Sequence, residues 1–331
     1  MLYRPAYDSA KRNENGGRPV AAPLGVIKPT IHNESKQQDY SFVRASLCQH
    51  GESPVWHAER GELFWVDMLS NNLYQYHVKT KTVCTYTFDR YTACVTPCDF
   101  NNVLLAQGDG IYRFHLYTNK LTKLTEFAGD NQKLRFNELK CDPRGRIFAG
   151  TMAKNESPFQ GGLHQFFDRR QHKEILDRVS IANGMAWSPD YKTFYFIDSP
   201  TRCILAFDYD IETGLTSNQR LCIDLSNEEG YPDGMTIDNE GHLWVAMWAG
   251  SQLLRVDPMA RKVVQNIPMP VKNPTSCCFG GPGMSQLFVT SSQKDLDDEA
   301  LKKYPRSGAV FVIDTHHTGC PSYLSNPSFQ S

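Results

Sequence analysis

The amino-acid sequence predicts an all-β protein with the architecture of a six-bladed β-propeller. Strand-like runs come in pairs separated by turn signals, and almost nothing resembles a helix longer than two turns. A strand-turn-strand unit also recurs with a period of about 41 to 50 residues, the range typical of propeller blades. Six units can be aligned, on Trp56, Cys98, Cys141, Trp187, Ile237 and Cys278. A β-sandwich or two smaller β-domains is the alternative, but regular spacing without a linker-like break favours one propeller.

The units share one internal order. A short apolar strand runs into a polar turn, and a second strand follows, as in ELFWVD, RIFAGTM, TFYFID and HLWVAMW. Third strands are predicted at NLYQYHV, GIYRFHL, GLHQFF, CILAFDYD and QLLRVD. Aromatic and polar residues alternate in these runs, which fits sheets stacked face to face around an axis. The single candidate helix is the charged stretch DLDDEALKKY at residues 295–304.

The two ends of the chain lack this repeat. Residues 1–40 are rich in Asn, Gly, Pro, Lys and Gln without periodicity, which predicts a mobile N-terminal extension. Residues 316–331 have a similar character and are predicted to form a C-terminal tail, so the propeller is assigned to residues 41–315.

Composition excludes several classes of function. The net charge of -1 gives no indication of a nucleic-acid partner or a membrane surface, and no apolar run is long enough to span a bilayer. The N-terminus lacks the hydrophobic core of a secretory signal, so a cytoplasmic location is predicted. The ten cysteines are scattered over the whole length and are interpreted as buried thiols rather than disulfides.

Four oxygen-bearing residues occupy one equivalent place in the repeat: Glu52, Asn137, Asn183 and Asp233. Each lies five residues before the residue at which a strand enters a polar turn. Equivalent positions of a circular repeat converge on its axis, so these side chains are expected to be neighbours that suit a hard cation. An isolated Asn-Gly or Asp-Gly pair would predict a type I′ hairpin turn. Here the hairpin turn comes later, at SPDYK and DNEG, so the pairs are predicted to open blades instead.

Seven ordered motifs between residues 47 and 315 carry a family resemblance: GESPVW, RFNELKCDPRGRIFAGTM, SIANGMAWSPD, YFIDS, FDYDIETG, PDGMTIDNEGHLWVAMW and SCCFGG. Together they resemble the animal regucalcin (senescence marker protein) branch of the gluconolactonase and luciferin-regenerating-enzyme family. The resemblance implies a six-bladed propeller with one divalent cation at its axis. It also implies hydrolysis of sugar lactones, with a small-molecule lactone as the partner.

The resemblance further implies roles for individual residues. Glu52, Asn183 and Asp233 match the three protein ligands of the cation, which would be Ca²⁺, Mg²⁺, Mn²⁺ or Zn²⁺. Asp233 also matches the proposed general base. Arg135 and Asn137 match substrate-binding positions, although from the residues alone Arg135 could be a surface arginine and Asn137 a turn residue.

The chain departs from the family pattern on the predicted sugar-binding side. Where relatives usually have Arg-x-Asn-Asp-Gly-Lys, it has RFNELK, so Leu139 replaces a glycine. Leu139 is therefore expected in a loop beside the ring-binding residues, where it would alter the substrate range. After GTM, where some relatives place an acidic substrate contact, Asn155 precedes Glu156. Glu156 is taken as the candidate contact, while the sequence leaves open which of the two faces the pocket. Asp198, in YFIDS, is interpreted as a structural residue at a strand end.

The predicted activity is a divalent-metal-dependent hydrolase that opens sugar lactones, with Asp233 as general base for the attacking water. The alternative is a calcium-binding regulatory protein of the regucalcin type with little or no turnover. A propeller that serves only as an interaction platform is a third hypothesis, and the alignment of Glu52, Asn183 and Asp233 argues against it. No G-x-S-x-G nucleophile motif occurs.

Overall fold

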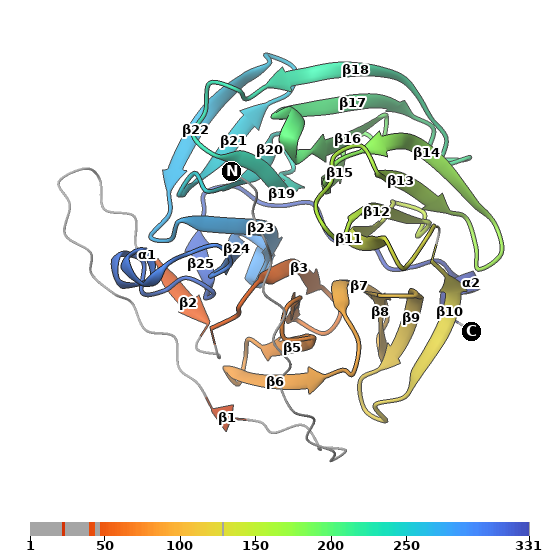
Figure 1. Ribbon diagram of the computed structural model, residues 1–331, viewed down its shortest axis with the longest axis horizontal. Coiled ribbons are helices and arrows are strands. Elements are labelled where there is room, and N and C mark those ends of the chain that lie inside the picture. Colours follow the sequence, from red (N-terminus) through yellow and green to blue (C-terminus); the bar gives the residue numbers. More distant parts are fainter. Residues whose placement is uncertain (1–21, 24–39, 44–46, 128, 331) are drawn as a thin grey trace.

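The computed structural model describes residues 22–23, 40–43, 47–127 and 129–330. Six antiparallel sheets are arranged in a ring around a central axis, as Figure 1 shows in a view down the shortest dimension of the molecule. Each sheet is one blade, so the predicted six-bladed β-propeller is confirmed. The six residues on which the repeat was aligned all lie in the innermost strands of their blades.

The first three blades follow the chain from the axis outward. The first contains β3 (Gly51–His57), β4 (Glu62–Asp67), β5 (Asn72–His77) and β6 (Thr82–Thr87). The second contains β7 (Thr92–Asp99), β8 (Asn102–Gln107), β9 (Gly110–His115) and β10 (Leu121–Glu126). The third contains β11 (Leu134–Cys141), β12 (Ile147–Ala153), β13 (Gly161–Phe166) and β14 (His172–Val179).

The remaining blades repeat this order. The fourth contains β15 (Ala182–Trp187), β16 (Thr193–Asp198), β17 (Cys203–Tyr209) and β18 (Thr216–Asp224). The fifth contains β19 (Tyr231–Ile237), β20 (Leu243–Trp248), β21 (Gln252–Asp257) and β22 (Lys262–Pro268). The sixth contains β23 (Asn273–Gly280), β24 (Gln286–Ser292) and β25 (Val310–Asp314). Its fourth strand comes from the other end of the chain.

That fourth strand is β2 (Ser41–Val43), which pairs with β25 at the outer side of the sixth blade. A segment from the N-terminal side therefore completes the last blade and joins the two ends of the propeller. A further short strand, β1 (Ala22–Pro23), pairs with β6 of the first blade. The rest of the predicted N-terminal extension, residues 1–21 and 24–39, lies outside the described residues.

Helices are few and short. Helix α1 (Asp298–Lys303) lies between β24 and β25, as predicted from the stretch at 295–304, and the Asp297 side chain caps it by accepting a hydrogen bond from the Ala300 amide. Helix α2 (Pro327–Gln330) ends the described chain, and two 3₁₀ turns, η1 (Ser199–Thr201) and η2 (Pro282–Met284), follow β16 and β23. Within the described part of the chain, no helix is long and apolar enough to cross a membrane.

Every innermost strand contains an irregularity at the same place. The ladder to the second strand shifts register between Glu52 and Val55 in β3, and equivalent shifts occur in the other five inner strands: 92/94, 136/138, 182/185, 232/235 and 274/276. Asn137, Asn183 and Asp233 fall inside these shifts, and Glu52 lies at the edge of one. A bulge locally releases residues from the ladder and re-aims their side chains. The repeat position that the sequence singled out is therefore a bulge.

Crowding at the axis explains the glycines that follow Asn183 and Asp233. A Cβ atom on Gly184 would lie 2.7 Å from Cγ of Met235, and one on Gly234 would lie 2.0 Å from Oγ of Ser276. Both residues lie within strands, β15 and β19, rather than in hairpin turns. The prediction that these Asn-Gly and Asp-Gly pairs open blades is confirmed, and the glycines permit adjacent inner strands to pack closely.

Leu139 does not lie in a loop. It belongs to β11, is 1% exposed, and packs in a hydrophobic cluster formed by the first three blades, together with Val95, Leu105 and Phe136. The expectation that it sits beside the candidate ring-binding residues was wrong, because the segment RFNELKC continues as a strand beyond the bulge at Asn137. Leu139 thus contributes to the core rather than to a binding surface.

The C-terminal segment packs against the propeller. Phe329 on α2 is fully buried, its carbonyl accepts a hydrogen bond from the Cys98 thiol, and the Asn326 amide donates to the carbonyl of Gly145. Gly319 forms a β-bridge with Asp238. The boundary of the predicted tail near residue 316 stays a prediction, but the residues after it, through 330, form part of the packed structure.

Candidate metal and substrate site

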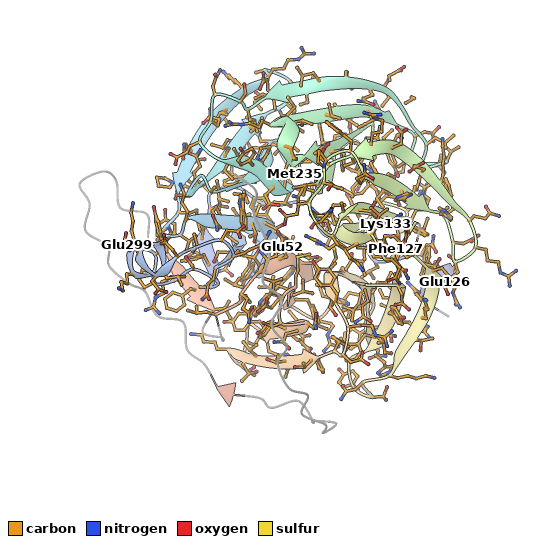
Figure 2. The ribbon with its side chains drawn as sticks, viewed as in Figure 1. Glu52, Glu126, Phe127, Lys133, Met235 and Glu299 are labelled. Atoms are coloured by element: carbon orange, nitrogen blue, oxygen red, sulfur yellow. The ribbon has the colours of Figure 1, made fainter. Side chains whose placement is uncertain are left out.

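A pocket of about 360 Å³ lies at one end of the axis. All six residues predicted to form the site line it: Glu52, Arg135, Asn137, Glu156, Asn183 and Asp233. Figure 2 shows Glu52 on β3 close to the centre of the ring, whereas Glu299 on α1 lies at its outer side. These residues come from blades one, three, four and five, so only closure of the ring places them together.

Glu52 and Asp233 form a buried acidic pair, with exposed fractions of 7% and 6%. Burial and then the negative charge of Glu138 raise the pKa of Glu52 to about 8, against a hydrogen bond from the Ser53 amide at 2.8 Å. Burial, then Glu52 and Glu138, raise the pKa of Asp233 well above its usual range. Two carboxylates that repel each other in a poorly solvated place favour the binding of a cation between them.

The side chain of Asn183 is oriented by a short hydrogen-bond chain. Its Nδ2 donates to Oγ of Ser199 at 2.9 Å, and this hydroxyl donates to the carbonyl of Pro232 at 2.6 Å. Because Nδ2 donates this hydrogen bond, the other terminal atom of the side chain must be the amide oxygen Oδ1. No described residue donates a hydrogen bond to that oxygen. Asn183 therefore presents a free amide oxygen to the pocket that also contains the two carboxylates.

These three residues fit a hard divalent cation. Two carboxylates and an amide oxygen are the donors that such ions prefer, and burial together with carboxylate repulsion raises the pKa values of Glu52 and Asp233 despite the nearby positive charges of Arg135 and Lys294. Among the described residues, no group of three or more His, Cys, Asp or Glu side chains is arranged to hold a metal ion. The set of Glu52, Asp233 and Asn183 contains two carboxylates, and its third oxygen donor belongs to an asparagine.

Asn137 is arranged differently from Asn183. Its Nδ2 donates to the carbonyl of Ala182 at 2.8 Å, and its Oδ1 accepts from Nη1 of Arg135 at 2.7 Å. Arg135 in turn lies over the ring of Tyr91, with Cζ 5.3 Å from the centroid. The oxygen of Asn137 is thus directed to a guanidinium group, and the pair Arg135–Asn137 forms a braced polar wall of the pocket.

Glu156, rather than Asn155, faces the pocket. Its Oε1 accepts from Nζ of Lys294 at 2.6 Å, and both residues line the cavity. Asn155 lines a neighbouring hollow instead, together with Asp130, Gln132 and Ser157. The sequence left this choice open because both side chains are polar and adjacent.

Other pocket residues were not found from the sequence: His50, Tyr231, Trp248 and Lys294. His50 lies two residues before Glu52 in the sequence, and its Nδ1 lies 2.8 Å from Oγ of Ser292. Burial, then the charges of Lys294 and Arg135, lower the pKa of His50 to about 3, so its imidazole is neutral. Tyr231 and Trp248 lie at the ends of β19 and β20. The alternating pattern of the sequence did not distinguish these two aromatic residues from residues of the core.

Asp198 has the structural role expected of a strand-end residue. Its carboxylate accepts hydrogen bonds from the amides of Ser180 and Ile181, at 3.1 and 2.9 Å. Asp67 does the same in the first blade, where it accepts from the amides of Gln49 and His50. Both aspartates therefore fix the chain segment that enters an inner strand just before a site residue.

Comparison with known proteins agrees with this architecture. The family model described as SMP-30/Gluconolactonase/LRE-like region matches residues 50–293. Regucalcin from Oryctolagus cuniculus is 39% identical over 271 residues, which cover 80% of this chain and 91% of the relative. The crystal structure of a calcium-binding protein, regucalcin, from Agrobacterium tumefaciens has a TM-score of 0.82 at 26% identity and covers 86% of this chain and 96% of its own. A luciferin-regenerating enzyme has a TM-score of 0.81 at 27% identity, with coverage of 91% and 100%.

The fold and the pocket define a six-bladed propeller with an acidic site at one end of its axis. The chain belongs to the SMP-30/gluconolactonase/LRE-like family. The expected resemblance to the regucalcin branch is likewise confirmed, because proteins of that name match over most of the chain.

Proposed function

We propose that this protein is a divalent-metal-dependent lactonase of the gluconolactonase type. The observation that carries the proposal is the convergence of Glu52, Asp233 and the free oxygen of Asn183 in a pocket that also contains Arg135 and Asn137. Family membership supports the same class of reaction, since the matching family model includes gluconolactonases in its description. The partner would be a small-molecule lactone, with no role for nucleic acid or membrane.

Glu52, Asn183 and Asp233 would hold the cation, which would be Ca²⁺, Mg²⁺, Mn²⁺ or Zn²⁺. When bound, the cation would polarise the lactone carbonyl and offset the charge that develops on its oxygen. The surrounding residues would perform the remaining tasks. Arg135, braced by Asn137 and Tyr91, would donate hydrogen bonds to oxygens of the substrate ring and hold the ester in place.

Asp233 would act as the general base. Its carboxylate is buried in the pocket, and burial, then the charges of Glu52 and Glu138, raise its pKa against the opposing charge of Lys294, so it has a strong tendency to accept a proton. A water molecule beside Asp233 would lose its proton to the carboxylate as it attacks the carbonyl carbon. The ring C–O bond then breaks, and the proton passes to the alkoxide, which gives the open-chain hydroxy acid.

The second candidate is a calcium-binding regulatory protein with little turnover. It uses the same three oxygen donors, and it is supported by the Agrobacterium tumefaciens relative, whose structure is described as a calcium-binding protein. The two proposals differ in what happens after the metal binds. In both cases a cytoplasmic location fits the ten free cysteines, since a reducing compartment keeps thiols unpaired.

The decisive experiment combines metal stoichiometry with a lactone panel. Purified protein is expected to bind one divalent cation and to hydrolyse lactones when loaded with Mn²⁺, Mg²⁺, Zn²⁺ or Ca²⁺ in parallel assays. Asp233→Ala should lose both properties, whereas Asp208→Ala, which removes an exposed carboxylate from β17, the third strand of the fourth blade, should retain both. Metal binding without turnover on any lactone would favour the regulatory protein, and unchanged metal binding by Asp233→Ala would remove the proposed site.

A further inference from the structure

One ion pair crosses the mouth of the pocket. Glu156 lies in the connection between β12 and β13 of the third blade, and Lys294 follows β24 of the sixth blade. The inner strands contact one another in the cyclic order β3, β7, β11, β15, β19 and β23, so these blades lie on opposite sides of the axis. Among the ion pairs of the described residues, Glu156–Lys294 alone joins blades that are not neighbours. A 2.6 Å contact between them must therefore span the axial opening.

Both partners are held in position by turns. Glu156 has a φ of +60°, in the left-handed region that residues other than glycine, asparagine and aspartate rarely adopt, and its amide donates to the carbonyl of Ala153. The amide of Lys294 donates to Oγ of Ser292 at 2.9 Å. Its Nζ also lies 6.0 Å from the ring centroid of Trp248, another pocket residue. Unusual backbone geometry at ligand clamps is a recognised use of local strain.

We propose that Glu156 and Lys294 form a latch that closes the pocket over Glu52, Asn183 and Asp233. The identity of the molecules that pass the latch rests on the proposed lactonase function, whereas the existence of the latch does not. Lys294 is a positioning residue in this reaction: it draws the β12–β13 connection across the axis and so determines how small molecules and ions enter and leave.

Exposure shows why the contact can open. The side chains of Glu156 and Lys294 are 48% and 29% exposed, and ion pairs in that environment are weak enough to break and re-form readily. The pocket, at about 360 Å³, lies in the range of cavities that hold small ligands. A lactone ring is therefore of a size that fits beneath the ion pair, and its entry or release would require the pair to open.

The first test measures escape of the metal rather than turnover. Protein loaded with Mn²⁺ is mixed with excess chelator, and the rate of metal loss is followed. Lys294→Met and Glu156→Gln should each lose Mn²⁺ about threefold faster than the wild type, and the double variant should be no faster than either single variant. The charge-reversed protein, with Lys294→Glu and Glu156→Lys together, should return toward the wild-type rate.

The matched control is Lys272→Met. Lys272 forms an ion pair with Glu229 at 3.2 Å, and its side chain is 32% exposed, a fraction similar to that of Lys294. That pair joins the two connections that flank the fifth blade and does not line the pocket. Its removal should leave the rate of metal loss unchanged. Equal rates in Lys294→Met and the wild type would overturn the latch. If loaded protein hydrolyses lactones, Lys294→Met should change KM more than kcat, since access and positioning change while the Asp233 carboxylate is retained.

A second measurement needs neither metal nor activity. In metal-free protein, the amides of Lys154, Glu156 and Phe159 donate hydrogen bonds and should be partly protected from hydrogen exchange. Lys294→Met should speed exchange in a peptide covering 153–160, on the opposite blade, by about threefold, whereas Lys272→Met should not. A wild type that binds no Mn²⁺ would refute the proposed function, but the exchange measurement would still test the latch. Equal exchange rates at 153–160 in Lys294→Met and the wild type would overturn the latch.

Discussion

The two ends of the axial channel are built from the same inner strands and yet have opposite character. One end is the charged pocket described above. The other is a small chamber of about 70 Å³, lined largely by apolar side chains such as Met185, Trp187 and Ile237. Cys320, Pro321, Ser322 and Tyr323 also line this chamber, so the C-terminal segment lies across that end. One end of the propeller is thus filled as core, and the other holds the charged pocket.

The boundary between the two ends lies at Glu138 and Lys140 on β11. Nζ of Lys140 donates to the carbonyls of Met185 and Met235, at 2.9 and 2.6 Å, and so connects the third blade to the fourth and fifth. Burial raises the pKa of Glu138, while the charge of Lys140 opposes this shift. On β11, the bulge at Asn137 therefore lies at the change from pocket-lining residues to core residues. Asn137, Asn183 and Asp233, which lie within bulges, line the pocket, whereas Leu139, which follows a bulge, returns to the ladder and to the core.

The largest expected effect lies at the packed end. Leu139→Ala should lower the free energy of unfolding by about 2 to 5 kcal/mol, because it removes a buried side chain from the cluster formed by the first three blades. Chemical denaturation measures this value. Leu69→Ala is the control, since that leucine is 48% exposed and its loss should cost little. A small effect on stability together with altered kcat/KM ratios across lactones would show instead that Leu139 acts in the pocket.

At the open end, Asp233→Asn should reduce turnover by a factor of about 10² or more at saturating metal, which corresponds to about 2.7 kcal/mol. Asparagine keeps an oxygen near the position of the carboxylate but is a poor proton acceptor. Steady-state kinetics with metal content measured in parallel would separate the loss of the base from the loss of the cation. The control Asp208→Asn should be unaffected. Turnover near that of the wild type in a fully loaded Asp233→Asn protein would rule out the base.

The acidic pair also predicts a dependence on pH. Burial and Glu138 raise the pKa of Glu52 from 4.5 to about 8 in the metal-free fold, and the pKa of Asp233 is raised as well. Protonated carboxyls therefore favour the folded state: this contribution is fully present below 4.5 and is lost as the pH rises through about 8. A cation binds the charged forms, so its affinity should increase with pH, by up to about tenfold per unit in this window.

Thermal unfolding with and without Mn²⁺ at pH 6 and at pH 8.5 would measure this dependence. The increase in Tm caused by Mn²⁺ should be larger at the higher pH, because less proton release accompanies binding there. The outer ion pair of Arg220 and Asp208 is exposed and gives an internal comparison, since Arg220→Lys should leave the pH profile unchanged. An affinity that is constant over the window would mean that Glu52 and Asp233 are not the ligands.

The smallest effect is expected at the braced wall of the pocket. Arg135→Lys keeps the charge but loses the planar fork that bonds Asn137 and lies over Tyr91. KM for lactones should rise about three- to tenfold with kcat less affected, which corresponds to about 1 kcal/mol. Initial-rate measurements across the lactone panel provide the values. If kcat falls while KM stays constant, Arg135 serves the reacting carbonyl and not the ring.

Much of the architecture could be predicted from the sequence. The period of the repeat identified six blades, and equivalence within that repeat indicated that Glu52, Asn183 and Asp233 would meet at the axis. Local chemistry was enough here, because turn residues and alternation recur in every blade. The roles of these residues and of Arg135, Asn137 and Glu156 stay predictions until the metal and the reaction are measured.

Some features depended on contacts between distant segments. Leu139 was expected in a loop beside the pocket because it replaces a glycine of the family pattern, and the sequence does not show that a bulge at Asn137 lets the strand continue through Leu139. It could not choose between Asn155 and Glu156, since the choice depends on Lys294, which is 138 residues away from Glu156. The buried position of Phe329 was also unexpected, because a short polar segment carries no periodic signal.

By itself, then, the sequence determined the number of blades and the shared position of the oxygen donors, because both follow from a local pattern that is repeated along the chain. Only the tertiary structure decided which side chains face the pocket, which enter the core, and which pair across the axis. Those outcomes depend on ring closure, which brings opposite blades within reach of each other, and on bulges that change side-chain direction within a single strand.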